Sequence, residues 1–120
     1  MLGPYKNLQV WQTAMLFVTE IYKITREYPH EEIYGLVNQM RRAAVSITSN
    51  IAEGYGRSSN TDLIKFLYIS LGSSNELETQ IILSFNLQYI TEEQYERLET
   101  MNNEVNAKLR ALINTRSQYN

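Results

Sequence analysis

The stretch Gln39-Met40-Arg41-Arg42-Ala43-Ala44-Val45-Ser46-Ile47-Thr48-Ser49-Asn50-Ile51-Ala52-Glu53-Gly54 decides the fold of this chain of 120 residues. Within it, Met40, Ala44, Ile47 and Ile51 recur at spacings of three and four, which predicts the apolar face of a helix. The opposite side carries small and polar residues, so the segment is too polar for plain core and too patterned for plain surface. Small side chains between charged ones would let another backbone come close, so we expect a tightly packed helix pair.

Length and composition place the chain among ordinary globular domains. Its 120 residues are typical of one domain, and 43% of them are apolar. No cysteine is present, which excludes disulfides, zinc–thiolate sites and cysteine nucleophiles. The net charge of −2 argues against an indiscriminate nucleic-acid binder. Because no apolar run approaches the ~20 residues of a membrane span and no signal-peptide core is seen, we expect a cytoplasmic protein without membrane association.

The distribution of breaks and apolar periodicity predicts a single all-α domain. The only prolines, Pro4 and Pro29, fall outside the periodic segments, and no run alternates long enough to favour a strand. Four helices are predicted, over about residues 7–27, 34–53, 60–86 and 92–115. Short connections between helices of similar length favour an up-down-up-down antiparallel four-helix bundle.

Several local signals mark the ends of these helices. Gly54 is suited to be a left-handed C-cap of the second helix. Ser59 or Asn60 can cap the third helix, and Thr91 with Gln94 has the spacing of a capping box for the fourth.

The first and third helices carry wider apolar arcs than one small bundle needs. A helix packed on one side requires about one apolar face, whereas each of these two has a pair of adjacent stripes. We therefore predict a homo-oligomer, although scattered exposed apolar residues on a monomer are the alternative. The stripes of the first helix are Leu8, Trp11, Met15, Val18 and Tyr22, then Val10, Ala14, Phe17, Ile21, Ile24 and Tyr28. Those of the third are Leu63, Phe66, Leu77 and Ile81, then Ile64, Leu67, Leu71, Ile82 and Phe85.

A polar stripe on the second helix is the first candidate site. Its spacing places four residues on one face, and the antiparallel third helix brings Glu76 within reach of Arg42. We expect Arg42 to pair with Glu76 or Glu53, and Asn50 and Ser73 to form hydrogen bonds inside the hairpin. The group is interpreted as a structural seam that fixes the register of the two helices, because buried polar groups need partners; a groove for a ligand or RNA is the alternative. The stripe comprises Arg42, Ser46, Ser49 and Glu53.

A second candidate is a basic patch near the connection between the second and third helices. Arg41, Arg57 and Lys65 would supply phosphate contacts, repeated in each subunit of an oligomer, and Tyr55 would offer a surface for stacking bases. An ordinary solvated loop is the alternative.

Catalytic and cofactor signals are lacking. Bundle metal sites use Glu-x-x-His pairs on helices, but the one match, Glu27-Tyr28-Pro29-His30, contains a helix-ending proline. No P-loop, dinucleotide fingerprint or nucleophile elbow occurs. We therefore expect no metal, no cofactor and no enzymatic activity. The carboxylates early in the fourth helix are explained by its dipole and by solvent; they are Glu92, Glu93, Glu96 and Glu99.

Ordered blocks over nearly the whole chain resemble a known family. The sequence is similar to the four-helix-bundle proteins encoded in intervening sequences of bacterial 23S ribosomal RNA genes. The resemblance implies ring-shaped homopentamers. A related branch includes the basic accessory protein of diversity-generating retroelements, which works with a reverse transcriptase and nucleic acid; this chain, being slightly acidic, departs from it. The blocks are Leu8-Gln9-Val10-Trp11-Gln12 with Ala14, Tyr34-Gly35-Leu36, residues 39–47, residues 49–54, and Gly72-Ser73-Ser74-Asn75-Glu76-Leu77-Glu78.

Pattern and resemblance together lead to one expectation for function. We expect a non-enzymatic oligomeric scaffold that associates with itself and with RNA or DNA. The alternative is an adaptor that binds another protein and has no nucleic-acid role.

Overall fold

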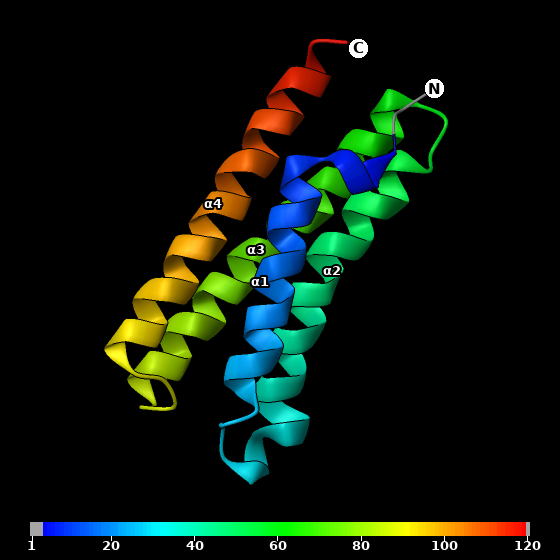
Figure 1. Cartoon of the computed structure of the whole chain (residues 1–120). Coiled ribbons are helices and arrows are strands. Elements are labelled where there is room, and N and C mark those ends of the chain that lie inside the picture. Colours follow the sequence, from blue (N-terminus) through cyan, green and yellow to red (C-terminus); the bar gives the residue numbers. More distant parts are fainter. Residues whose placement is uncertain (1–3, 120) are drawn as a thin grey trace.

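The computed structural model describes residues 4–119, and all the regular structure within this range is helical (Figure 1). Its four long helices are α1 (Gln9–Thr25), α2 (Asn38–Tyr55), α3 (Asn60–Asn86) and α4 (Glu92–Ser117). Short 3-10 helices span Tyr5–Asn7 and His30–Glu32, and a π-helical turn spans Ile33–Val37. The all-α class expected from the sequence is confirmed.

Successive long helices run in opposite directions, as Figure 1 shows. α2 packs between α1 and α3, α3 packs between α2 and α4, and α4 closes the ring of contacts against α1. The result is an elongated bundle of 45 × 24 × 20 Å. The order α1-α2-α3-α4 around the bundle places the α1–α2 edge opposite the α3–α4 edge.

The entry to α2 differs from the continuous helix expected from residue 34. Gly35 has the non-helical angles φ −109° and ψ −112°, and regular α-helix begins only at Asn38. The Glu32 carboxylate caps this entry by accepting a hydrogen bond from the Leu36 amide at 3.1 Å. A Cβ at Gly35 would lie 2.8 Å from that carboxylate oxygen, so the glycine leaves room for the cap.

The core lies along the inner faces of all four helices. The second predicted stripe of α1 is wholly buried, from Val10 to Tyr28, whereas in the first stripe Met15 and Tyr22 remain exposed. On α3, Leu67 and Leu71 are buried but Ile82 and Phe85 are exposed. On α1 one stripe is therefore fully buried and the other is only partly covered by this subunit, whereas on α3 both stripes are buried only in part, because Phe66 of the first stripe is half-buried.

Two of the predicted caps are confirmed, and one is wrong. The Ser59 side chain accepts from the Asp62 amide, and Thr91 and Gln94 form a reciprocal capping box. Gly54, however, is not a left-handed cap, because no described glycine has a positive φ and α2 continues through Tyr55 to a cap at Gly56.

Gly54 instead allows α2 and α3 to approach each other closely. It is buried, and a Cβ there would lie 2.9 Å from Leu63 Cδ1 and 3.0 Å from Phe66 Cβ. Both of these atoms belong to the first turns of α3, so any larger side chain would push the two helices apart at the start of the hairpin.

A polar layer joins α3 to α4. The Ser74 hydroxyl donates to Asn102 Oδ1 at 2.8 Å, and Asn102 Nδ2 donates to the Ser74 carbonyl at 3.1 Å. Asn106 Nδ2 also donates to Ser74 Oγ at 3.1 Å. Because Ser74 and Asn102 are buried, these bonds specify which turns of the two helices lie side by side.

Replacing the two glycines of the hairpin should have opposite effects. Gly54→Ala gains helix propensity but forces overlap with Leu63 and Phe66, so we expect a net loss of about 1–3 kcal/mol in the free energy of unfolding. Gly72→Ala is the matched control, because Gly72 is exposed on α3 with nothing within 4 Å of its Cβ position; it should gain about 0.5–1 kcal/mol. Urea unfolding at one fixed protein concentration measures both, and an equal gain in the two variants would contradict close packing at Gly54.

Candidate functional site

The central part of the predicted polar seam between α2 and α3 is formed in the structure. Ser73 Oγ donates to Ser46 Oγ at 2.8 Å, and Ser70 Oγ donates to the Ile47 carbonyl at 2.8 Å. Asn50 Nδ2 donates to the carbonyl and to the hydroxyl of Ser46, at 2.8 and 3.0 Å. The predicted bond of Ser73 inside the hairpin is confirmed, whereas Asn50 bonds within its own helix.

The predicted ion pairs of Arg42 are not formed. Within residues 4–119, Arg42 makes no ion pair, and Glu53 pairs instead with Arg57 at 2.9 Å. Arg42, Ser49, Glu53 and Glu76 are all exposed. Ser46 and Ser73 form a hydrogen bond with each other at the centre of the seam, so the charged groups at its rim are not needed as partners and remain solvated. An ion pair between exposed groups would contribute little to the free energy of folding.

Arg42 and Glu76 nevertheless border a common hollow between α2 and α3. The hollow has a volume of about 420 Å³ and its floor includes the two bonded serines. Its full lining is Asn38, Gln39, Arg42, Ala43, Ser46, Ser73 and Glu76.

Arg41 is fixed to the C-terminal end of α1. Its Nε donates to Thr25 Oγ1 at 3.0 Å and its Nη2 donates to the Tyr22 carbonyl at 3.2 Å. The guanidinium carbon lies 4.6 Å from the centroid of the Tyr22 ring. The cation thus satisfies a carbonyl at a helix C-terminus and stacks on an aromatic face, both of which favour positive charge.

The predicted basic patch does not come together within one subunit. Arg41 lies near the start of α2 and Arg57 beyond its end, separated by roughly 24 Å along the helix axis at ~1.5 Å per residue. Tyr55 is only 8% exposed, so it offers no surface for stacking a base. Arg57 is held by Glu53 and lies 4.8 Å from the Phe66 ring centroid, while Lys65 is exposed. Tyr55 turns inward because the final turn of α2 is still helical.

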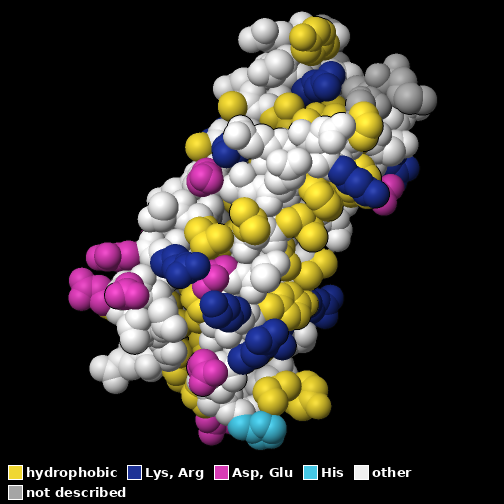
Figure 2. All heavy atoms as spheres, viewed as in Figure 1, with side chains coloured by type: hydrophobic (Ala, Val, Ile, Leu, Met, Phe, Trp, Pro, Cys, Tyr) yellow, Lys and Arg dark blue, Asp and Glu magenta, His cyan; other side chains and the backbone are white. Residues whose placement is uncertain are grey.

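A larger feature of the surface is an apolar strip along the groove between α1 and α2. Figure 2 shows hydrophobic side chains in a band over these two helices. Met15 is 40% exposed, Tyr22 37% and Val45 39%. A neighbouring hollow of about 540 Å³ is lined by Tyr22, Asn38, Arg41, Arg42, Val45 and Ser46. We call the strip the α1–α2 apolar face, and define it by Trp11, Met15, Val18, Tyr22 and Val45.

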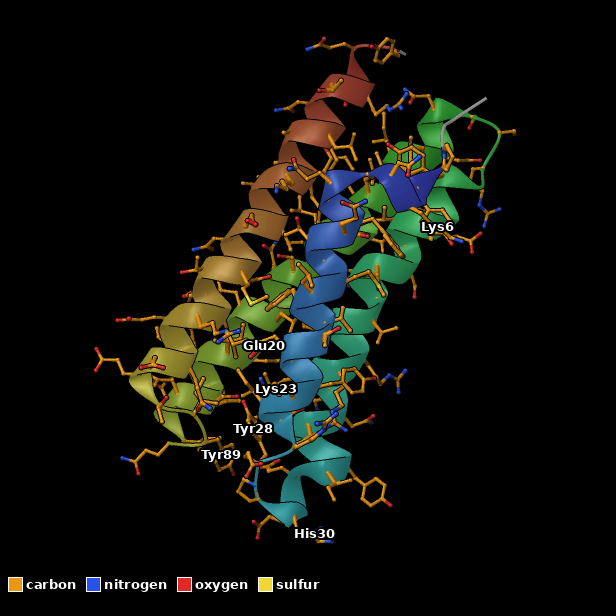
Figure 3. All side chains as sticks on the ribbon, viewed as in Figure 1. Lys6, Glu20, Lys23, Tyr28, His30 and Tyr89 are labelled. Atoms are coloured by element: carbon orange, nitrogen blue, oxygen red, sulfur yellow. The ribbon has the colours of Figure 1, made fainter. Side chains whose placement is uncertain are left out.

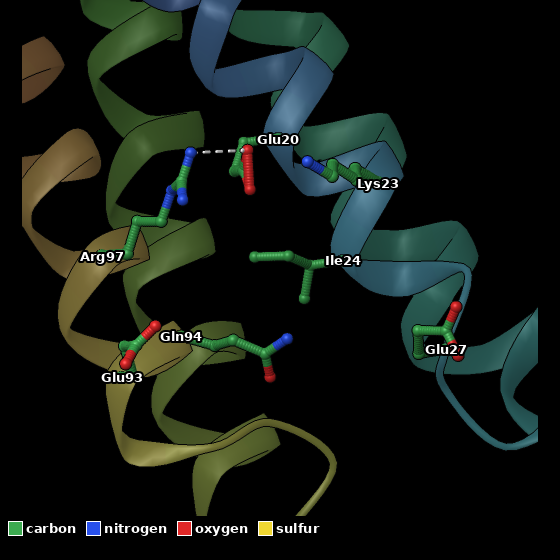
Figure 4. Close-up of a pocket in the computed structure, with 7 residues that line it drawn as sticks. All are labelled: Glu20, Lys23, Ile24, Glu27, Glu93, Gln94 and Arg97. Carbon is green, nitrogen blue, oxygen red and sulfur yellow. Dashed lines mark hydrogen bonds and ion pairs between the residues drawn. The ribbon is translucent and has the colours of Figure 1, made fainter.

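A further hollow lies between α1 and α4 and was not predicted. Its volume is about 300 Å³, and Figure 4 shows side chains of both signs around Ile24. Arg97 Nη2 lies 3.3 Å from Glu20 Oε1 across it, which ties the two helices together. Arg97 and Glu20 are far apart in the sequence, so no local spacing could have revealed this pair. The remaining lining residues are Lys23, Glu27, Glu93 and Gln94.

A hydrogen bond and a ring contact also connect the two loops at one end of the bundle, where Figure 3 labels Tyr28, His30 and Tyr89. The Tyr89 hydroxyl donates to Glu32 Oε2 at 2.7 Å, and the Tyr28 and Tyr89 rings lie 5.3 Å apart. The hydrogen bond from Tyr89, followed by that from the Leu36 amide, lowers the pKa of Glu32. The same bond to Glu32 is the main cause that raises the pKa of Tyr89.

Two further kinds of feature, membrane spans and metal sites, are absent from residues 4–119. None of the helices there combines the length and the apolar character needed to cross a bilayer. In the same range, no three histidine, aspartate or glutamate side chains are grouped to hold a metal ion.

The Tyr89–Glu32 bond should be visible in the titration of Glu32. Tyr89→Phe removes the donor, so we expect the pKa of Glu32 to rise toward its ordinary value, measured by NMR through the side-chain carboxyl carbon. A carboxyl with a lowered folded-state pKa stabilises the fold above its unfolded-state pKa and loses that contribution as pH falls. The difference in unfolding free energy between wild type and variant should therefore shrink on acidification.

Tyr34→Phe is the control for this titration, because Tyr34 lies in the same segment but is 94% exposed. An unchanged pKa of Glu32 in Tyr89→Phe, or an equal change in Tyr34→Phe, would contradict the assignment.

Comparison with known proteins agrees with this architecture. Residues 6–111 match the family described as 23S rRNA-intervening sequence protein. The chain therefore belongs to this family, as the resemblance implied.

A solved structure gives the same result. The bundle is similar to the crystal structure of a protein of unknown function from the S23 ribosomal protein family of Bacteroides thetaiotaomicron, with a TM-score of 0.78 and 31% sequence identity. The match covers 87% of this chain and 97% of that one. A search among functionally curated proteins found no match.

Proposed function

We propose that this protein is a non-enzymatic scaffold that associates with itself through the α1–α2 apolar face. The observation that carries the proposal is the exposure of Met15, Tyr22 and Val45 on neighbouring helices, in line with the half-buried Trp11 and Val18. Contiguous exposed apolar surface of this kind marks interaction sites more often than single scattered residues do.

The shape of the face suits a helical neighbour. The strip follows α1 from Trp11 to Tyr22, roughly 17 Å at ~1.5 Å per residue, and Val45 widens it onto α2. Stable interfaces bury about 800 Å² on each partner, so the strip would form the apolar centre of a contact with polar residues at its rim. A neighbour would also cover the part of the α1 stripe that the core leaves exposed.

Placing a charge in this face should separate the subunits. Met15→Glu and Val45→Glu each put an unpaired carboxylate into the proposed contact, so we expect at least a tenfold weaker association constant, from light scattering with in-line chromatography over a range of concentrations. Ala107→Glu, on the exposed side of α4, is the control and should leave association unchanged. A wild type that is monomeric at micromolar concentration would overturn the proposal.

Nucleic acid is the further partner to test first, because the family description names 23S rRNA. Within residues 4–119 of one subunit, Arg41, Arg57 and Lys65 do not come together, so RNA or DNA binding would depend on arginines and lysines brought together by several copies. Such binding would proceed through phosphates and fall steeply as salt rises. A protein-binding adaptor would instead use apolar surface, and its binding would weaken much less.

A salt titration separates these two roles. If nucleic acid is the partner, raising the salt from 50 to 200 mM should weaken the binding of labelled RNA about tenfold or more, and Arg57→Glu/Lys65→Glu should weaken it at both concentrations. Fluorescence anisotropy measures both effects. Absence of RNA binding at 50 mM salt would leave the adaptor role as the function of the scaffold.

A further inference from the structure

The hollow between α2 and α3 that Arg42 and Glu76 border has an unused hydrogen-bond donor in its floor. Ser73 Oγ donates to Ser46 Oγ at 2.8 Å, and Asn50 Nδ2 donates to the same oxygen at 3.0 Å. A serine hydroxyl accepts up to two hydrogen bonds and donates one. Ser46 therefore accepts twice, while its own hydrogen has no acceptor within residues 4–119. Ser73 is only 8% exposed, so an acceptor that entered this hollow would bind at a floor largely removed from bulk water.

The walls of the hollow carry one charge of each sign. Arg42 lies one helical turn before Ser46 on α2, and Glu76 lies one turn after Ser73 on α3. Because α2 and α3 are antiparallel neighbours, these two steps lead in the same direction along the hairpin (Figure 1). Arg42 and Glu76 therefore both line the hollow beyond the serine pair, and neither forms an ion pair within residues 4–119. A guanidinium and a carboxylate are thus both available to a ligand.

The size and the remaining lining of the hollow suit a small polar molecule. Its volume of about 420 Å³ lies within the ~300–1,000 Å³ typical of small-molecule sites. Ala43 contributes only a methyl group to the lining, which leaves the space between the charged walls open. Asn38 and Gln39 add two side-chain amides, each of which can both donate and accept a hydrogen bond.

A ligand of a single sign would be opposed by one wall of the hollow. A phosphate or a simple carboxylate would be attracted by Arg42 but repelled by Glu76, and an ammonium group would meet the reverse. An α-amino acid carries both charges on one carbon atom. Its carboxylate can accept two parallel hydrogen bonds from the Arg42 guanidinium and one from the Ser46 hydroxyl, while its ammonium group donates to Glu76. A zwitterion therefore satisfies the floor and both walls together.

We propose that the hollow between α2 and α3 binds a free α-amino acid as its zwitterion, with the carboxylate held by Arg42 and Ser46 and the ammonium group held by Glu76. The inference goes beyond the scaffold role, because it gives the bundle a small-molecule ligand. The hollow is lined by α2 and α3 of one subunit and includes none of the residues that define the α1–α2 apolar face. Binding therefore does not require self-association.

Three small molecules of similar shape test the requirement for both charges. L-Alanine carries the two charges, propionate lacks the ammonium group, and ethylammonium lacks the carboxylate. Titration of ¹⁵N-labelled protein at neutral pH and constant ionic strength, followed through the side-chain amide signals of Asn38 and Gln39, gives each dissociation constant. We expect a value in the millimolar range for L-alanine and at least about fivefold weaker binding of the two fragments, because each fragment leaves one charged wall uncompensated.

Conservative variants assign each charge of the ligand to its wall. Glu76→Gln should weaken L-alanine about tenfold, to the level of propionate, and should leave propionate binding no weaker than in the wild type. Arg42→Gln should lower L-alanine binding to the level of ethylammonium. Glu78→Gln is the matched control, because Glu78 is an exposed carboxylate on the same helix that does not line the hollow; it should leave all three affinities unchanged.

These outcomes support the proposal, and three others overturn it. Equal affinity for L-alanine and propionate would show that the hollow recognises negative charge alone. Tighter binding of inorganic phosphate than of L-alanine would instead indicate a site for nucleic-acid phosphates. Unchanged Asn38 and Gln39 signals at about 50 mM L-alanine, well above a millimolar dissociation constant, would show that no such site exists.

The self-association proposed above is tested separately by one of its own variants. Met15→Glu lies on α1 outside the hollow and should bind L-alanine as the wild type does. A monomeric wild type that binds L-alanine would overturn self-association and leave this inference standing, whereas an associated wild type with no affinity for L-alanine would do the reverse.

Discussion

The close contact between α2 and α3 is the constraint on which the rest of the bundle depends. Gly54 admits the first turns of α3, and further along the hairpin Ser46 and Ser73 meet through a hydrogen bond of 2.8 Å. A contact made by small residues fixes both the distance and the register of two helices, because any slip would overlap side chains with backbone or leave a buried hydroxyl unpaired. α1 and α4 then pack on the sides of this hairpin.

The close, partly polar packing of the α2–α3 hairpin also affects the surface of the bundle. Serines at 70, 73 and 74 of α3 face its partners, so that part of the helix buries hydroxyls rather than large apolar groups. The large apolar residues of α3 lie elsewhere, and Ile82 and Phe85 reach the outer edge beside Tyr95. On the opposite edge, one stripe of α1 is buried while the other stays partly open. The packing that gives the subunit its register therefore also leaves apolar side chains exposed on two edges of the bundle.

The charged side chains are divided in a similar way. Some join elements of the subunit, as Arg41 joins α2 to the end of α1 and Arg97 joins α4 to Glu20. Others, such as Arg42 and Glu96, remain at the rims of the apolar surfaces with no ion pair inside residues 4–119. The net charge of −2 does not reveal which charged side chains are paired and which are not. The positions of the charged residues therefore say more about the contacts of this protein than its net charge does.

The sequence by itself determined the four helices, most of their ends and their apolar stripes, because these follow from local periodicity and from caps that span three or four residues. It also indicated that α1 and α3 carry more apolar surface than one bundle buries. Only the tertiary structure decided what Gly54, Arg42 and Tyr55 do. A glycine after a helix pattern suits a cap or a close contact equally well, and the neighbouring helix selects the contact. An arginine such as Arg42 can pair with any carboxylate in reach. Tyr55 faces inward or toward solvent according to whether α2 continues through it as a helix. Such outcomes depend on distances between segments far apart in the chain, which no local spacing encodes.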